Sequence, residues 1–319
     1  MNATSPYQFI KELKEFLNQQ KEKLREQKNV QAKNQNYETA TLYRNIEKKL
    51  ENFLRQLELK TSNNQTMIET FDKTLYAEAK EEVIKKIKET HKWDTTEGFI
   101  ADGVICPEIY EKQKVRFLVL LAESYGYSGH GLVDIEEQPD EDVLGVGDVK
   151  RQTPRKISAL LWLVFQSLDS NKKVEWEQFP NLLEGTVDNY NKLQETLARI
   201  AYLNVKKASR PIEQFGNGAT RLNYSEIYES GCKNQDILRL QIESIKPHFI
   251  IVCSDPVFEC VYDNSLVGEK IEFKKWSVQT NEFGQKVIYV SHPNYLTDWG
   301  YESLYETYGL IYNSLNSSN

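Results

Sequence analysis

The sequence predicts an α/β protein, a three-layer α/β/α sandwich with a mostly parallel central sheet, preceded by an α-helical N-terminal region. From about residue 96 onward, short continuous apolar runs alternate with segments of helical spacing, as in sheets covered on both faces. Before that point, apolar residues recur only at three- and four-residue spacing, which is typical of amphipathic helices. We therefore divide the 319-residue chain into a helical region 1–95 and an α/β domain 96–319.

The helical region begins at Ser5 and Pro6, a capping side chain followed by a ring suited to the first helical position. Apolar stripes then cover residues 9–24, 46–57 and 67–87, with a polar break at TSNNQ before the third. Narrow apolar seams on polar helices favour a helical hairpin or coiled coil. Such helices would pack on the main domain, on a second copy in a homodimer, or on a protein partner, and the pattern leaves these options open.

The α/β domain shows its elements in a clear order. We expect strands at 117–122, 200–203, 249–254 and 287–290, and helices at 157–168 and 237–245. No internal repeat interrupts this alternation.

Charge and hydropathy narrow the function classes. The chain carries 40 Lys and Arg against 47 Asp and Glu, a net charge of -7, which does not favour an indiscriminate polyanion binder. No run approaches the roughly 20 apolar residues of a membrane span, and the N-terminus lacks the apolar core of a secretory signal. We expect a cytoplasmic protein without a membrane partner.

The cysteines predict no metal site. Cys106, Cys232, Cys253 and Cys260 are widely spaced and form no C-x-x-C pair, so we interpret them as structural thiols.

Three apolar runs each end near a polar residue that is a candidate for binding or catalysis. RFLVLLAESYG contains Glu123, RIAYLNVKK contains Asn204, and KVIYVSHPNYL contains His292. Ligands of α/β folds bind beyond the carboxyl ends of parallel strands, so these side chains are expected to converge on one pocket. Each also has a structural interpretation, as a helix cap, a turn residue and a loop residue respectively.

In this order, the motifs LAESYG, AYLN and SHPNYL resemble the uracil-DNA glycosylase superfamily over roughly residues 100–310. The resemblance implies a DNA glycosylase without metal or organic cofactor. Glu123 and His292 would be catalytic, the first orienting the attacking water and the second donating to the departing base. Asn204 would read the flipped base, and Tyr125 would wall the pocket against a 5-methyl group.

The same resemblance suggests DNA contacts. Leu296 stands at the spacing of the apolar wedge that fills the gap left by the flipped base. Ser254 matches a serine that pinches the DNA backbone. Lys206 and Lys207 form a basic run beside Asn204, as KRQTPRK does at 150–156, and such runs are either solvated surface or phosphate contacts.

The sequence departs from the superfamily pattern around Glu123. AESYG lacks the usual Gly before the acid and the Pro after it, and Tyr127 stands in place of a clear base-stacking Phe. An acidic loop at 129–148 leaves room for an enlarged pocket, so the target is uracil or a bulkier modified pyrimidine, as in phage defence. The alternative is a non-catalytic glycosylase-like module that binds or senses DNA. An enzyme acting on free nucleotides ranks third, because no phosphate-binding glycine motif opens a helix.

Overall fold

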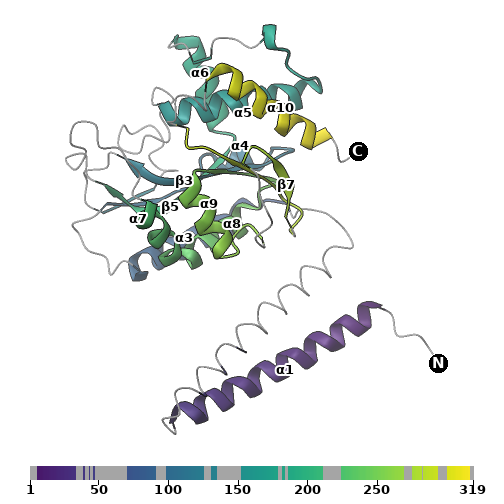
Figure 1. Ribbon diagram of the computed structural model, residues 1–319, viewed down its shortest axis with the longest axis vertical. Helices are drawn as coiled ribbons and strands as arrows, with labels where there is room; N and C mark the ends of the chain where they lie inside the picture. Colours follow the sequence, from purple (N-terminus) through teal and green to yellow (C-terminus); the bar gives the residue numbers. More distant parts are fainter. Residues whose placement is uncertain are drawn as a thin grey trace. The chain divides into compact units, whose positions relative to one another are not determined.

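A computed structural model gives the fold of the protein (Figure 1). It describes residues 6–33, 39, 43, 46, 70–90, 98–125, 131–134, 152–178, 182–183, 186–210, 224–268, 275–281, 283–293 and 300–316. The expected α/β class with a mostly parallel sheet is confirmed. The chain divides into two compact units, Met1–Met67 and Ile68–Asn319.

The first unit contains the long helix α1 (Pro6–Lys33), as the apolar stripe at 9–24 predicts. Phe16 on this helix is 55% exposed, so the first unit does not bury the whole stripe by itself. An ion pair of 3.0 Å joins Arg25 to Glu22 one turn away. Most of the predicted second stripe, 46–57, lies outside the described residues.

The third predicted helix, α3 (Lys73–Thr90), belongs to the second unit, which moves the expected boundary from residue 95 to residue 67. Asp72 begins the helix, because its carboxylate accepts the backbone N–H groups of Thr74 at 2.8 Å and Leu75 at 3.1 Å. The reason for the new boundary is packing, since the seam of α3 is covered by α8 (Gln235–Ile245). Ile87 is fully buried against Ile237 of that helix.

The sheet follows the strand order β4-β1-β5-β3-β6-β8-β7, and β2 also pairs with β5. Its strands are β1 (Gly98–Ala101), β2 (Gly103–Val104), β3 (Phe117–Tyr125), β4 (Gly131–Asp134), β5 (Ala201–Arg210), β6 (Phe249–Cys253), β7 (Val278–Thr280) and β8 (Lys286–Val290). The four central strands β5, β3, β6 and β8 are parallel. β1 and β2 run antiparallel to β5, and β7 runs antiparallel to β8.

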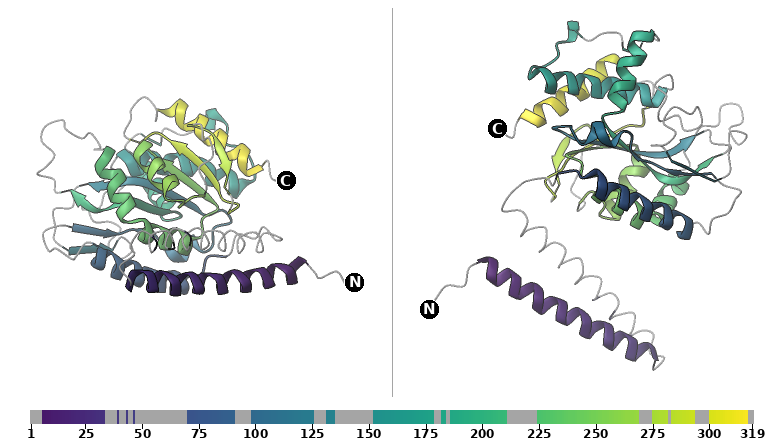
Figure 2. Two further views of the ribbon diagram at one scale, coloured as in Figure 1. Left: turned by 60° about the horizontal axis from the view of Figure 1, so that its bottom comes forward. Right: turned by 180° about the vertical axis from the view of Figure 1, so that it is seen from behind.

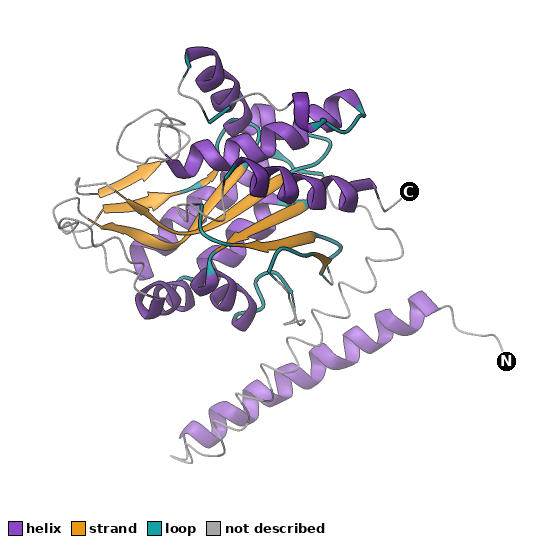
Figure 3. Ribbon diagram, turned by 45° about the horizontal axis from the view of Figure 1, so that its top comes forward, coloured by secondary structure: helices purple, strands orange, loops and turns teal. Residues whose placement is uncertain are grey.

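Successive side chains of the central strands point to opposite faces of the sheet, and the side chains of each face belong to a separate buried cluster. The other helices of the second unit are α4 (Pro107–Tyr110), α5 (Gln152–Ser170), α6 (Val187–Leu197), α7 (Tyr224–Lys233), α9 (Asp255–Asp263) and α10 (Tyr301–Asn316). One cluster joins the sheet to α5, α6 and α10, and the other joins it to α7, α8 and α9. These two groups of helices lie on opposite sides of the sheet in Figures 1 and 2, and Figure 3 shows the strands between them.

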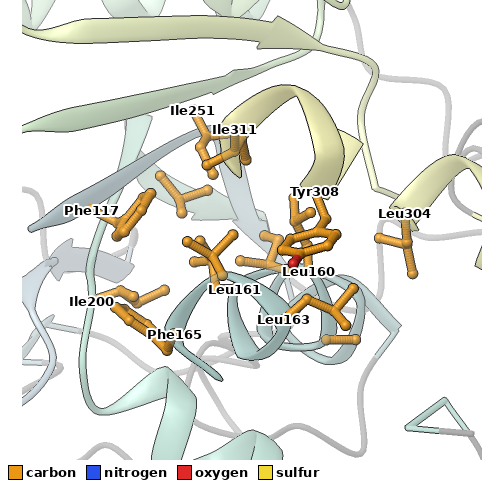
Figure 4. Packing of buried hydrophobic residues seen from close by; sticks show 14 of the residues in the cluster. Phe117, Leu160, Leu161, Leu163, Phe165, Ile200, Ile251, Leu304, Tyr308 and Ile311 are labelled. Atoms are coloured by element: carbon orange, nitrogen blue, oxygen red, sulfur yellow. The ribbon is translucent and has the colours of Figure 1, made fainter. Parts of the chain in front are cut away.

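The cluster around α5 includes aromatic rings, of which Figure 4 labels Phe117 of β3, Phe165 of α5 and Tyr308 of α10. Phe117 of β3 meets Phe165 of α5 edge-on, with ring centroids 5.5 Å apart, and stacks on Phe249 of β6 at 5.4 Å. This packing fixes α5 against the middle of the sheet. The first turn of α5 is thereby held near the carboxyl ends of the strands, where it contacts the segment after β8.

Candidate functional site

The carboxyl ends of the four parallel strands gather the predicted site residues at one edge of the sheet. In its register, Glu123 of β3 lies opposite Lys206 of β5, two residues beyond Asn204. Ser254 directly follows β6, and His292 is the second residue after β8. The three motifs therefore end at the same edge of the sheet, and the convergence of their side chains on one pocket stays a prediction. Ligands of parallel α/β sheets bind at this edge.

Asn204 is buried and has its amide nitrogen engaged by a carboxylate that the sequence did not single out. Its Nδ2 donates to Asp102 Oδ2 at 3.1 Å, and its backbone N–H donates to the same oxygen at 2.5 Å. Asp102 reaches this position because it lies between β1 and β2, both of which pair with β5. A lone acid in the turn-like stretch ADG gives no sequence signal for such a contact.

Lys207 is the cation of this network, which corrects the expectation that it contacts DNA. Its ammonium lies 2.6 Å from Asp102 Oδ1, and both side chains are fully buried. Burial lowers the pKa of Lys207, and the adjacent carboxylate opposes that shift. Phosphate groups cannot reach an ammonium enclosed in this way.

Lys206 pairs with Glu226 of α7 at 2.5 Å. The lysine is nearly buried, whereas the side chain of Glu226 is 38% exposed. Lys206 thus reaches an acid near the surface. Its expected role in DNA binding stays a prediction.

His292 is buried and neutral. Burial is the main cause that lowers its pKa to about 4, and the ammonium of Lys156 adds to the shift. Lys156 stands in the first turns of α5 and donates to the backbone oxygen of Pro293 at 2.8 Å. A neutral imidazole is an N–H donor and a nitrogen acceptor at once, so His292 can donate to an oxygen without carrying charge.

Lys156 is a second residue whose place in the site the sequence did not predict, although it belongs to the basic run KRQTPRK. Burial lowers its pKa, and neighbouring Arg155 lowers it further. The Arg155 Nε–H is buried and has no hydrogen-bond partner among the described residues. Two cationic groups therefore stand at the end of α5 that faces the segment after β8.

Ser254 has a strained backbone. Its φ of 92° and ψ of 153° fall in a region that glycine adopts almost alone. The residue is buried, and within the described part of the chain its Oγ has no hydrogen-bond partner. Its N–H donates to the backbone oxygen of Val290 at 2.9 Å, so the strained peptide joins the ends of β6 and β8. Strain and an unsatisfied hydroxyl at a strand end are typical of functional positions.

The remaining predicted residues are placed only in part. Glu123 and Tyr125 lie in β3, where the sheet pairs Tyr125 with Arg210, and the structure describes their backbone alone. A register shift between these two residues marks an irregularity at the strand end. Leu296 and Tyr127 lie outside the described residues.

Comparisons with known proteins place the chain in no family. No family model matches it, and no curated protein matches its sequence. Within the described residues, no helix is long and apolar enough to cross a membrane. The same residues contain no cluster of three or more His, Cys, Asp or Glu side chains that could bind a metal ion.

Proposed function

We propose that the second unit is a monofunctional DNA glycosylase that hydrolyses the N-glycosidic bond of a uracil or modified pyrimidine flipped out of DNA. The α/β unit would then be a three-layer α/β/α sandwich with its active site at the carboxyl edge of the parallel strands. The observation that carries the proposal is that two groups lie at that same edge of the sheet, the Asn204 amide held by a carboxylate and the buried imidazole of His292. Both groups suit recognition of a pyrimidine edge.

The reaction needs water and no cofactor. Water attacks C1′ of the sugar while the C1′–N bond breaks, and the electron pair of that bond leaves with the base. The carboxylate of Glu123 orients the water, accepts its proton, and opposes the positive charge that develops on the sugar. The base departs as an anion and is protonated afterwards.

His292 stabilises the departing base in this proposal. A neutral imidazole donates an N–H to a base oxygen as negative charge develops there, which is the role of an oxyanion-hole donor. The pKa of about 4 keeps the imidazole neutral throughout the physiological range. Lys156 adds positive potential beside it, which favours an anionic leaving group.

Four further residues complete the proposed DNA site. The Ser254 hydroxyl, which has no hydrogen-bond partner among the described residues, would donate to a backbone phosphate once bound DNA uncovers it, and Lys206 would add positive charge at the same sheet edge. Leu296 fills the space left in the base stack, and Tyr125 limits the size of the accepted base. The first unit would bind a second copy or another protein through the apolar stripe of α1, on which Phe16 is 55% exposed. A cytoplasmic role in defence against phage DNA fits an enzyme for modified pyrimidines.

One observation favours a second candidate, a non-catalytic DNA-binding or sensing module. Asn204 is only 1% exposed and His292 only 5% exposed, so both residues are also satisfactory as structural groups. A module of this kind would bind DNA and leave it intact.

Base release separates the two candidates. DNA containing uracil, cytosine or 5-hydroxymethylcytosine is incubated with the protein, and free bases are identified by mass spectrometry. The glycosylase predicts release that is lost in Glu123→Gln and in His292→Ala, with both variants folded by circular dichroism. Salt-sensitive binding without any abasic product across these substrates would favour the sensing module.

A further inference from the structure

The Asp102 carboxylate is the centre of a fully buried network at the edge of the sheet. Its Oδ2 accepts the two N–H donors of Asn204, and its Oδ1 accepts Lys207 Nζ at 2.6 Å and Gln241 Nε2 at 3.2 Å. Gln241 also donates to the backbone oxygen of Asp102 at 2.7 Å. Strand β5 and helix α8 thus both supply donors to this one acid.

This network determines which end of the Asn204 amide is the nitrogen. An ionised carboxylate has no hydrogen to donate, so the amide atom 3.1 Å from Asp102 Oδ2 must be Nδ2. Rotating the amide by half a turn would place its oxygen against that carboxylate. The charge-assisted bond that would be lost biases the two orientations by roughly 10- to 100-fold.

The orientation of the Asn204 amide matters because pyrimidines differ in the order of donor and acceptor along the edge that an amide reads. A 4-oxo pyrimidine such as uracil presents a ring N–H beside a carbonyl oxygen, whereas a 4-amino pyrimidine such as cytosine presents a ring nitrogen acceptor beside an amino group. An amide matches either edge, but for a base held in one pose each edge requires the opposite amide orientation. Whatever fixes the amide therefore fixes the choice between these two classes of base.

We propose that Asp102 is a positioning residue that sets base selectivity, because its carboxylate locks the Asn204 amide in one orientation. Lys207 holds that carboxylate in place through the ion pair of 2.6 Å. The inference rests on the proposed glycosylase function and adds to it the residue that separates 4-oxo from 4-amino pyrimidines.

The first test compares selectivity in variants of the network. The double variant Asp102→Asn/Lys207→Met removes both buried charges together, and its new amide can face Asn204 with either end. Gln241→Met is the matched control, because it removes a donor from Oδ1 and leaves the contacts of Oδ2 intact. The probe is kcat/KM for matched DNAs carrying 5-hydroxymethyluracil or 5-hydroxymethylcytosine at one position.

Selectivity is the kcat/KM for the DNA that the wild type prefers, divided by the kcat/KM for the other DNA. We expect this ratio to fall at least about tenfold in the double variant and to stay within about twofold of the wild-type ratio in Gln241→Met. A folded double variant that keeps the wild-type ratio would overturn the inference while leaving glycosylase activity established.

A second test needs neither activity nor a variant. NMR of the wild-type protein reports the side-chain amide of Asn204, whose Nδ2–H is expected to exchange with solvent at least about tenfold more slowly than amides of exposed Asn residues. Fast exchange would refute the locked amide even if the double variant failed to fold. Should the protein release no base at all, the proposed function fails, whereas fast exchange would refute the locked amide whether or not a base is released.

Discussion

Acid should destabilise this protein through His292. The imidazole has a pKa of about 4 in the folded chain, against about 6.5 when unfolded. Between these values the unfolded state binds the proton and the folded state does not, so stability falls as the pH falls from 6.5 toward 4. The full effect of this shift is about 3 kcal/mol, and about 2 kcal/mol of it is lost between about pH 7 and about pH 5.

The comparison of wild type with His292→Gln isolates this effect, because glutamine is neutral at every pH. His248 also has its pKa lowered to about 4 by burial, but it is present in both proteins and cancels. Urea unfolding followed by circular dichroism at the two pH values gives the free energy of unfolding for each protein. The wild type is expected to lose about 2 kcal/mol more than the variant on acidification. Equal losses would refute the buried neutral imidazole.

Other variants test the remaining parts of the site. Lys207→Met leaves a carboxylate buried without its cation and should lower the free energy of unfolding in urea by about 3 to 5 kcal/mol. Lys206→Met should lower it less, because the acid partner of Lys206 is partly exposed, and similar losses in the two variants would contradict the buried network. Ser254→Gly should raise the free energy of unfolding by about 1 kcal/mol, because the relief of backbone strain exceeds the entropy cost of glycine. The same variant should bind DNA more weakly. A free energy of unfolding below that of the wild type would mean that the backbone at Ser254 is unstrained. Lys156→Met should raise the pKa of His292 in an NMR titration and Lys156→Arg should not, whereas an unchanged pKa in both would remove Lys156 from the site.

The sequence predicted the central strands because each is a continuous apolar run, and both faces of the sheet are indeed covered. It did not predict β1 and β2, because the apolar run in GFIADGV is only three residues long and is flanked by glycine and Asp102. Periodicity also identified α3 as a helix but gave no sign of what covers it. That information lies in α8, far along the chain.

The candidate site was predictable where a residue follows a strand, as with Ser254 and His292. Asp102 could not be found in this way, because its role arises only when the β1–β2 segment pairs with a strand about 100 residues later. Lys207 was misjudged for a related reason. The polar run after Asn204 resembles an exposed strand end, yet β5 continues to Arg210 and its edge is covered by neighbouring strands.

The most direct test of the account is base release from DNA carrying uracil, cytosine, 5-hydroxymethylcytosine or glucosylated 5-hydroxymethylcytosine, measured by mass spectrometry beside Glu123→Gln. We predict that the wild-type protein frees at least one pyrimidine base and leaves an abasic site, and that Glu123→Gln does neither. Intact DNA with every substrate, from a folded protein that binds it, would contradict the glycosylase and leave the sensing module.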